Sequence, residues 1–233
     1  MNIKRWLPAF ISLGFIVLVI IISLTSTSNL PTFSIEDEYK IDKNEINNII
    51  KMLDTDNKSN AKTKLDELYK NHTKDDDYYL TDAKIIMATS NKIDAVGTLE
   101  NVVNRTEEYY DLMLNATAGE FFTYGKVPDR LIDTAIEAAN KNANNIKYQI
   151  LAGELFYDKD NYSASIYYLD KALQINPSNV DANYYYALNI YLLGEQEVGI
   201  AYMEEAKKLY KGDDTEFKNS IDNYISLMKE GKR

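Results

Sequence analysis

A helical pattern with a 34-residue period is the feature that most constrains the fold of this chain. The segment Ile146–Asn179 contains two amphipathic stretches, separated by a polar turn at residues 158–161 and closed by Pro177. Apolar residues recur within it every three or four positions, as one face of a helix requires. Beyond residue 35 only two prolines occur, Pro128 and Pro177, and apolar and polar residues show no sustained alternation. The sequence therefore predicts an all-α fold.

Small and apolar residues recur at matching places in this pattern. A step of 34 residues from Gly153 reaches Ala187 in one direction and Gly119 in the other, and a further step of 36 reaches Ala83. The matching positions of the second helices are Ala95/Leu99/Val102, Leu131/Ala135/Ala138, Ser165/Leu169/Ala172 and Gly199/Met203/Ala206, and a less regular unit with Ile49, Met52, Ala61, Leu65 and Leu68 precedes them. Small side chains let helices approach closely, so we expect helix pairs stacked on one another.

The unit at 146–179 resembles the tetratricopeptide repeat, a helix–turn–helix module of 34 residues. The matching residues are Gly153, Phe156, Tyr162, Ser165, Leu169, Ala172 and Pro177. Gln149 and Ala152 depart from the pattern, because a large aromatic residue and a leucine are commoner there. The resemblance implies a right-handed superhelical solenoid. Its expected parts are divergent hairpins over 36–111, repeats over 112–213 (112–145, 146–179 and 180–213) and a capping helix over 214–233, with Phe217, Ile221, Tyr224 and Met228 on one stripe.

The resemblance also implies a binding surface, because the first helix of each such repeat lines a concave groove. The residues assigned to this groove are Lys147, Ile150, Glu154, Tyr157, Asp181, Tyr184, Leu188 and Tyr191. An aromatic groove of mixed charge suits an extended peptide or a helix. The alternative is that its tyrosines pack between neighbouring units. Relatives that capture C-terminal carboxylates use a ring of Lys, Arg and Asn on this face, which these residues do not supply.

The N-terminal segment predicts a membrane anchor. Leu7 to Leu24 are free of charge, and at about 1.5 Å per residue a helix of this length covers about 27 Å, close to the thickness of the bilayer hydrocarbon. Lys4 and Arg5 precede it, so the positive-inside rule places residues 1–6 in the cytoplasm and residues 25–35 outside as a tether. The alternative is a signal peptide cleaved near Ser26 or Ser28.

Composition restricts the chemistry available to this chain. It has no Cys and a single His, His72, which excludes thiol nucleophiles and Cys- or His-pair metal sites. Lys4 and Arg5 are the only charged residues before Glu36, so the remainder carries 24 basic and 36 acidic side chains and repels nucleic acid. We expect no cofactor, no metal and no catalytic residue. The acidic clusters at Asp75–Asp77 and Asp213–Asp214 precede predicted helices and are expected to cap them.

These observations together predict a membrane-anchored, extracytoplasmic scaffold, and the composition resembles that of bacterial proteins. The resemblance extends to anchored repeat proteins that assist assembly or maintenance of cell-envelope complexes, so the expected partner is an envelope protein or peptide. Two alternatives stay open: a module that self-assembles into homo-oligomers, and a carboxylate-dependent hydrolase of envelope polymers. The hydrolase requires two acids that face one cleft.

Overall fold

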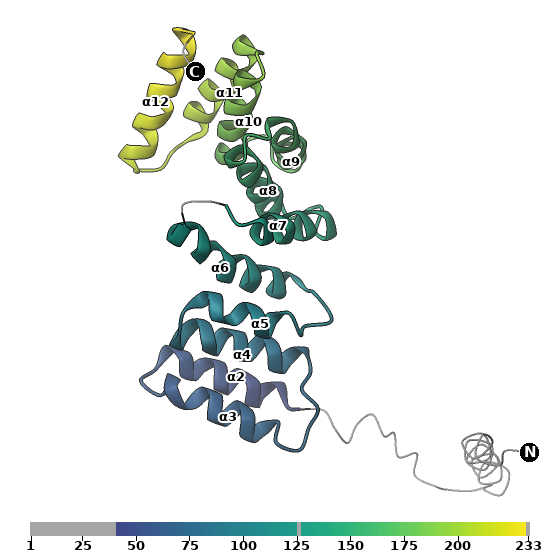
Figure 1. The fold of residues 1–233 in the computed structure, drawn as a ribbon. Helices are drawn as coiled ribbons and strands as arrows, with labels where there is room; N and C mark the ends of the chain where they lie inside the picture. The colour runs from purple at the N-terminus through teal and green to yellow at the C-terminus, as the bar shows by residue number, and fades with distance from the viewer. Residues whose placement is uncertain (1–40, 125–126, 232–233) are drawn as a thin grey trace, which may run out of the picture. The chain divides into compact units, whose positions relative to one another are not determined.

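The computed structural model describes residues 41–124 and 127–231, and the regular structure in these ranges is helical (Figure 1). The expected cytoplasmic stub, membrane span and tether over residues 1–35 lie outside the described residues. Within the described ranges no helix is both long enough and apolar enough to cross a membrane.

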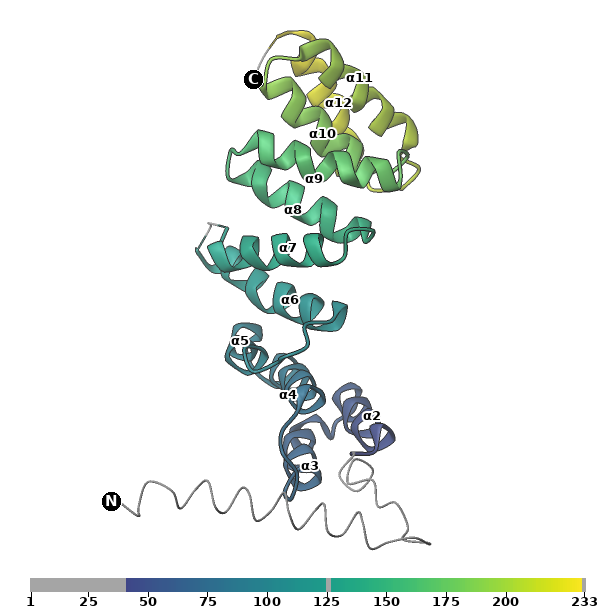
Figure 2. The same ribbon diagram turned by 90° about the vertical axis from the view of Figure 1, so that its right-hand side faces the viewer.

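Each helix packs against the next one along the chain, and Figure 2 shows this succession from the side. The first helices are α2 (Lys43–Lys51), η2 (Met52–Asp54), η3 (Lys58–Asn60), α3 (Ala61–Leu68), α4 (Asp76–Thr89), η4 (Lys92–Ala95), α5 (Val96–Leu99) and α6 (Glu107–Tyr124). They are followed by α7 (Asp129–Lys141), α8 (Ile146–Asp158), α9 (Tyr162–Ile175), α10 (Val180–Leu192), α11 (Gln196–Leu209) and α12 (Thr215–Lys229). The prediction of an all-helical array is confirmed for the described part of the chain.

Asn and Asp side chains begin many of these helices. Each accepts a hydrogen bond from a backbone N–H of the first turn, which would otherwise have no partner. The capping residues are Asp42, Asp75, Asn91, Asn145, Asn161, Asn179 and Asp214. The capping role expected for the two acidic clusters is therefore confirmed at Asp75 and Asp214.

The small residues of the 34-residue pattern lie where two helices touch. The positions predicted for the four second helices, from Ala95 to Ala206, are all buried, although Val102 follows the end of α5 and is not helical. Ser165 of α9 donates to the carbonyl of Gly153 in α8 over 2.6 Å. A Cβ atom at Gly153 would lie 2.6 Å from Cγ of Leu169, which is fully buried. Contact this close leaves no room for a side chain, which explains the glycine.

Gln149, one of the departures from the repeat pattern, has a structural role of its own. Its side chain is fully buried, and Nε2 donates to the carbonyls of Ala139 (2.7 Å) and Ala143 (3.3 Å). Asn183, one repeat later, donates in the same way to Pro177 and Asn179. A buried amide at this position thus ties the start of one helix pair to the turn that precedes it.

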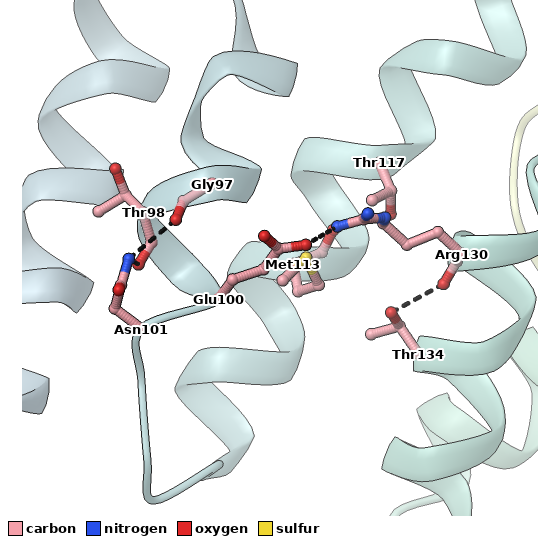
Figure 3. Close-up of polar contacts among 8 residues, drawn as sticks. All are labelled: Gly97, Thr98, Glu100, Asn101, Met113, Thr117, Arg130 and Thr134. Atoms are coloured by element: carbon pink, nitrogen blue, oxygen red, sulfur yellow. Dashed lines mark hydrogen bonds and ion pairs between the residues drawn. The ribbon is translucent and has the colours of Figure 1, made fainter.

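The helix α5 has only four residues, and polar side chains fix the chain beyond it. Asn101 donates through Nδ2 to the carbonyls of Gly97 (2.9 Å) and Thr98 (3.3 Å), which ends the helix (Figure 3). The carboxylate of Asp76, in the first turn of α4, then accepts the backbone N–H groups of Val103 (2.7 Å) and Asn104 (2.9 Å). This carboxylate therefore holds the connection to α6 in place.

Candidate protein-binding face

Six of the eight residues predicted for the groove are accessible on α8 and α10. Lys147 and Asp181 are exposed, and Lys147 forms an ion pair with Asp111 of α6 over 2.7 Å. The other four accessible residues are half-buried: Ile150, Glu154, Tyr157 and Tyr184.

The remaining two residues, Leu188 and Tyr191, do not line an open groove, and the expectation is corrected for them. Leu188 is 4% exposed and Tyr191 is 3% exposed. They share a hydrophobic cluster with Ile221, Ile225 and Met228 of α12. The Tyr191 hydroxyl also donates to the carbonyl of Met228 over 3.1 Å. The apolar stripe expected on the capping helix is thus present, and it covers the C-terminal half of α10.

A continuous series of aromatic rings extends from α8 to α12, and we call it the aromatic row. Its members are all half-buried and comprise Tyr157, Tyr162, Tyr184, Tyr185, Tyr210, Phe217 and Tyr224. The Tyr157 ring centre lies 6.0 Å from that of Tyr162 and 5.8 Å from that of Tyr185. Tyr184 lies 5.3 Å from Tyr185 and 5.9 Å from Tyr224. Each ring packs on its neighbours and still keeps part of its surface open to solvent.

Three carboxylates, Glu154, Asp158 and Asp181, lie beside the aromatic row. Glu154 accepts a hydrogen bond from the Tyr185 hydroxyl over 2.8 Å. Burial raises the pKa of Glu154 above its usual value; the hydrogen bond opposes this rise, and the charges of Asp158 and Asp181 add to it. Burial also raises the pKa of Asp158. Among the described residues, none of the three carboxylates forms an ion pair with Lys or Arg.

The sequence did not single out Tyr185 or Asp158, although both belong to this face. Selection by helical spacing took Asp181, Tyr184, Leu188 and Tyr191 from α10 and therefore passed over Tyr185. The structure places the Tyr185 ring against Tyr157 and its hydroxyl against Glu154. The run Tyr184–Tyr186 was the signal in the sequence that could have indicated Tyr185. Consecutive helical residues point in different directions, so three consecutive tyrosines cannot all lie on the face that helical spacing selects.

A recess of about 420 Å³ lies between α6 and α7, and it is lined by both arginines of the described residues, Arg105 and Arg130. Arg105 pairs with Glu137 of α7 over 2.7 Å, and Arg130 reaches from α7 to Glu100 beyond α5 (Figure 3). Burial would raise the pKa of Glu137, but Lys141, the Tyr110 hydroxyl and Arg105 lower it. The two ion pairs therefore join α7 to the residues at either end of the connection between α5 and α6.

Over 41–124 and 127–231, no group of three or more His, Asp or Glu side chains is placed to hold a metal ion.

The fold is of the tetratricopeptide type, as comparison with solved structures shows. A MamA AMB-1 structure matches with a TM-score of 0.59 and 16% identity, over 75% of this chain and 94% of that one. The MamA RS-1 ArsTM double mutant matches with a TM-score of 0.56 and 11% identity, over 74% and 96%. A crystal structure of MamA gives 0.55 and 17%, over 68% and 92%. At these identities the likeness shows the fold alone. No protein-family model and no curated protein matches the sequence.

Proposed function

We propose that this chain is a membrane-anchored scaffold that binds a protein partner outside the cytoplasm, in the assembly or maintenance of a cell-envelope complex. The tetratricopeptide-type fold supports the interaction role, since stacked helix pairs present extended surfaces. The observation that carries the proposal is the aromatic row. Half-exposed tyrosines supply a large, rigid contact area with a polar tip, which is why they are frequent at protein interfaces.

The anchoring part of the proposal depends on the sequence. The charge-free run Leu7–Leu24 has the length of a membrane span, and Lys4 and Arg5 lie on the side that stays in the cytoplasm. The acidic remainder of the chain would then lie outside.

Site-specific photocrosslinking in membranes tests the binding face. A photoreactive phenylalanine is placed at Tyr157, within the aromatic row, or at Tyr167 of α9, which is 55% exposed and outside the row. We expect a defined adduct from position 157, lost when Tyr184→Ala is added, and none from position 167. Circular dichroism checks that each variant remains helical. Equal adducts from both positions would contradict the assignment of the face.

The absence of Cys makes the topology directly testable. Single cysteines are introduced at Asn2 and at exposed Ser178, and intact cells are treated with a membrane-impermeant maleimide. We expect labelling of Ser178→Cys alone, and of Asn2→Cys only after lysis. Protection of both cysteines in intact cells would refute export of the helical part.

A further inference from the structure

We propose that the face formed by Tyr157, Tyr185 and the carboxylates of Glu154, Asp158 and Asp181 accepts a partner segment that carries a lysine or arginine side chain. This inference depends on the proposed function and names the chemistry of the partner segment.

The first argument is charge complementarity. The three carboxylates belong to two neighbouring helices, α8 and α10, which are in contact. Glu154 is half-buried, and the charged groups that influence its pKa are Asp158 and Asp181, which are also acidic. Elsewhere in the described chain, the buried Asp82 pairs with Lys62 over 2.9 Å, and the half-buried Glu137 pairs with Arg105. A positive side chain from a partner would supply here the counter-charge that this chain does not.

The second argument comes from the aromatic rings beside these carboxylates. A Lys or Arg head group is attracted to the face of a tyrosine ring, and the attraction increases when water is excluded. This chain uses the same contact internally, since Lys74 lies 4.3 Å from the Tyr78 ring centre and Lys171 lies 4.2 Å from the Tyr167 ring centre. Tyr157 and Tyr185 have tyrosine and carboxylate neighbours, and no such cation contact is present at them among the described residues.

Binding of matched peptides tests the inference. Fluorescein-labelled twelve-residue peptides of Ser and Ala, with two central Lys, Arg, Gln or Glu residues, are titrated into the full chain in non-ionic detergent, and anisotropy is measured. We expect the Lys and Arg peptides to bind about tenfold or more tightly than the Gln peptide, and the preference to fall with added salt. Binding independent of peptide charge, preference for Glu, or no binding of any peptide would overturn the inference.

Two variants with the same change in net charge distinguish binding at this site from nonspecific attraction of a basic peptide to an acidic chain. The Glu154→Gln/Asp158→Asn variant keeps an acceptor for the Tyr185 hydroxyl, and we expect it to weaken binding of the Lys peptide about tenfold. The control Asp133→Asn/Asp170→Asn changes net charge equally at exposed residues of α7 and α9, and binding should stay within about twofold. Equal losses in both variants would overturn the inference.

A third variant, Asp181→Asn, alters an exposed residue, so a change in its binding is not expected to result from loss of folding. It should weaken the Lys peptide and leave the Gln peptide unchanged, whereas unchanged Lys binding would count against the inference. The proposed function fails separately. If position 157 crosslinks specifically while peptide charge has no effect on binding, the scaffold role is supported, and the inference that the partner segment is basic is wrong.

Discussion

From α3 to the start of α8, four tyrosines have buried rings and donate their hydroxyl groups to carboxylates: Tyr69, Tyr78, Tyr110 and Tyr148. From the end of α8 to α12, in contrast, the rings of the aromatic row are half-exposed. The first kind includes Tyr78, which donates to Asp66 over 2.7 Å, and Tyr148, which donates to Asp111 over 3.0 Å. Asp66 and Asp111 also pair with Lys62 and Lys147. Tyr185 donates to Glu154, which has no such cation among the described residues. One residue type therefore fixes helices together in one region and forms a surface in the other.

The largest expected difference concerns loss of a whole ring. Tyr148 of α8 is 1% exposed, and its hydroxyl donates to the carbonyl of Glu107 in α6. Tyr148→Ala should therefore lower the free energy of unfolding by about 3–5 kcal/mol, because it leaves a cavity between the two helices. Tyr157→Ala should cost only about 1–2 kcal/mol, because its ring is partly solvated already. Urea unfolding of both variants, followed by circular dichroism, measures the difference. Equal losses would show that the aromatic row belongs to the core.

A smaller effect is expected from two glycines, Gly153 of α8 and Gly97 of α5. Gly153→Ala should destabilise the protein by about 1–3 kcal/mol, because the new methyl group overlaps buried Leu169. Gly97 in α5 has no atom within 4 Å of an added Cβ, so Gly97→Ala should be neutral or stabilising by up to about 1 kcal/mol. Thermal unfolding of the two variants compares them. A loss at Gly97 as large as that at Gly153 would mean that the two sites are equally tightly packed.

The smallest and most diagnostic effect concerns charge. The pKa of Glu137 is lowered in the fold, so the stability that its ionised form provides is present at neutral pH and is lost as the pH falls below 4.5, the ordinary pKa of this side chain, and through the lowered pKa. The pKa of Glu154 is raised, so its ionised form opposes folding at neutral pH and acidification relieves that cost. Glu137→Gln should therefore cost about 1 kcal/mol at pH 7, while Glu154→Gln should be neutral or stabilising.

Thermal unfolding at pH 7 and at pH 4 checks both signs. The difference between Glu137→Gln and the unaltered chain should shrink on acidification. A Glu154→Gln variant that is clearly less stable at pH 7 would contradict the assignment of Glu154 to an incompletely paired surface.

Local pattern was sufficient to predict the helix pairs α8–α9 and α10–α11. Gly153, Ser165, Leu169 and Ala172 are fixed by contacts between consecutive helices, and such contacts produce a regular spacing in the sequence. The same spacing could not show that Leu188 and Tyr191 are covered. The burial of these two residues depends on contacts with α12, a helix that follows the last repeat and has an apolar stripe of its own. Tyr185 was missed for a related reason, because its importance arises from contacts with α8 that one helix cannot reveal.

Because α12 covers the C-terminal half of α10, it limits where further helix pairs could be added to this array. A further helix pair added after residue 231 would meet a helix whose apolar stripe is already used and whose remaining surface is polar. An additional pair could be inserted upstream of α12, between Leu209 and Thr215, where the first helix of the new pair would present to α12 the kind of surface that α10 now presents. In an engineered version with more helix pairs, α12 would therefore be expected to follow the last pair while the number of pairs before it changes.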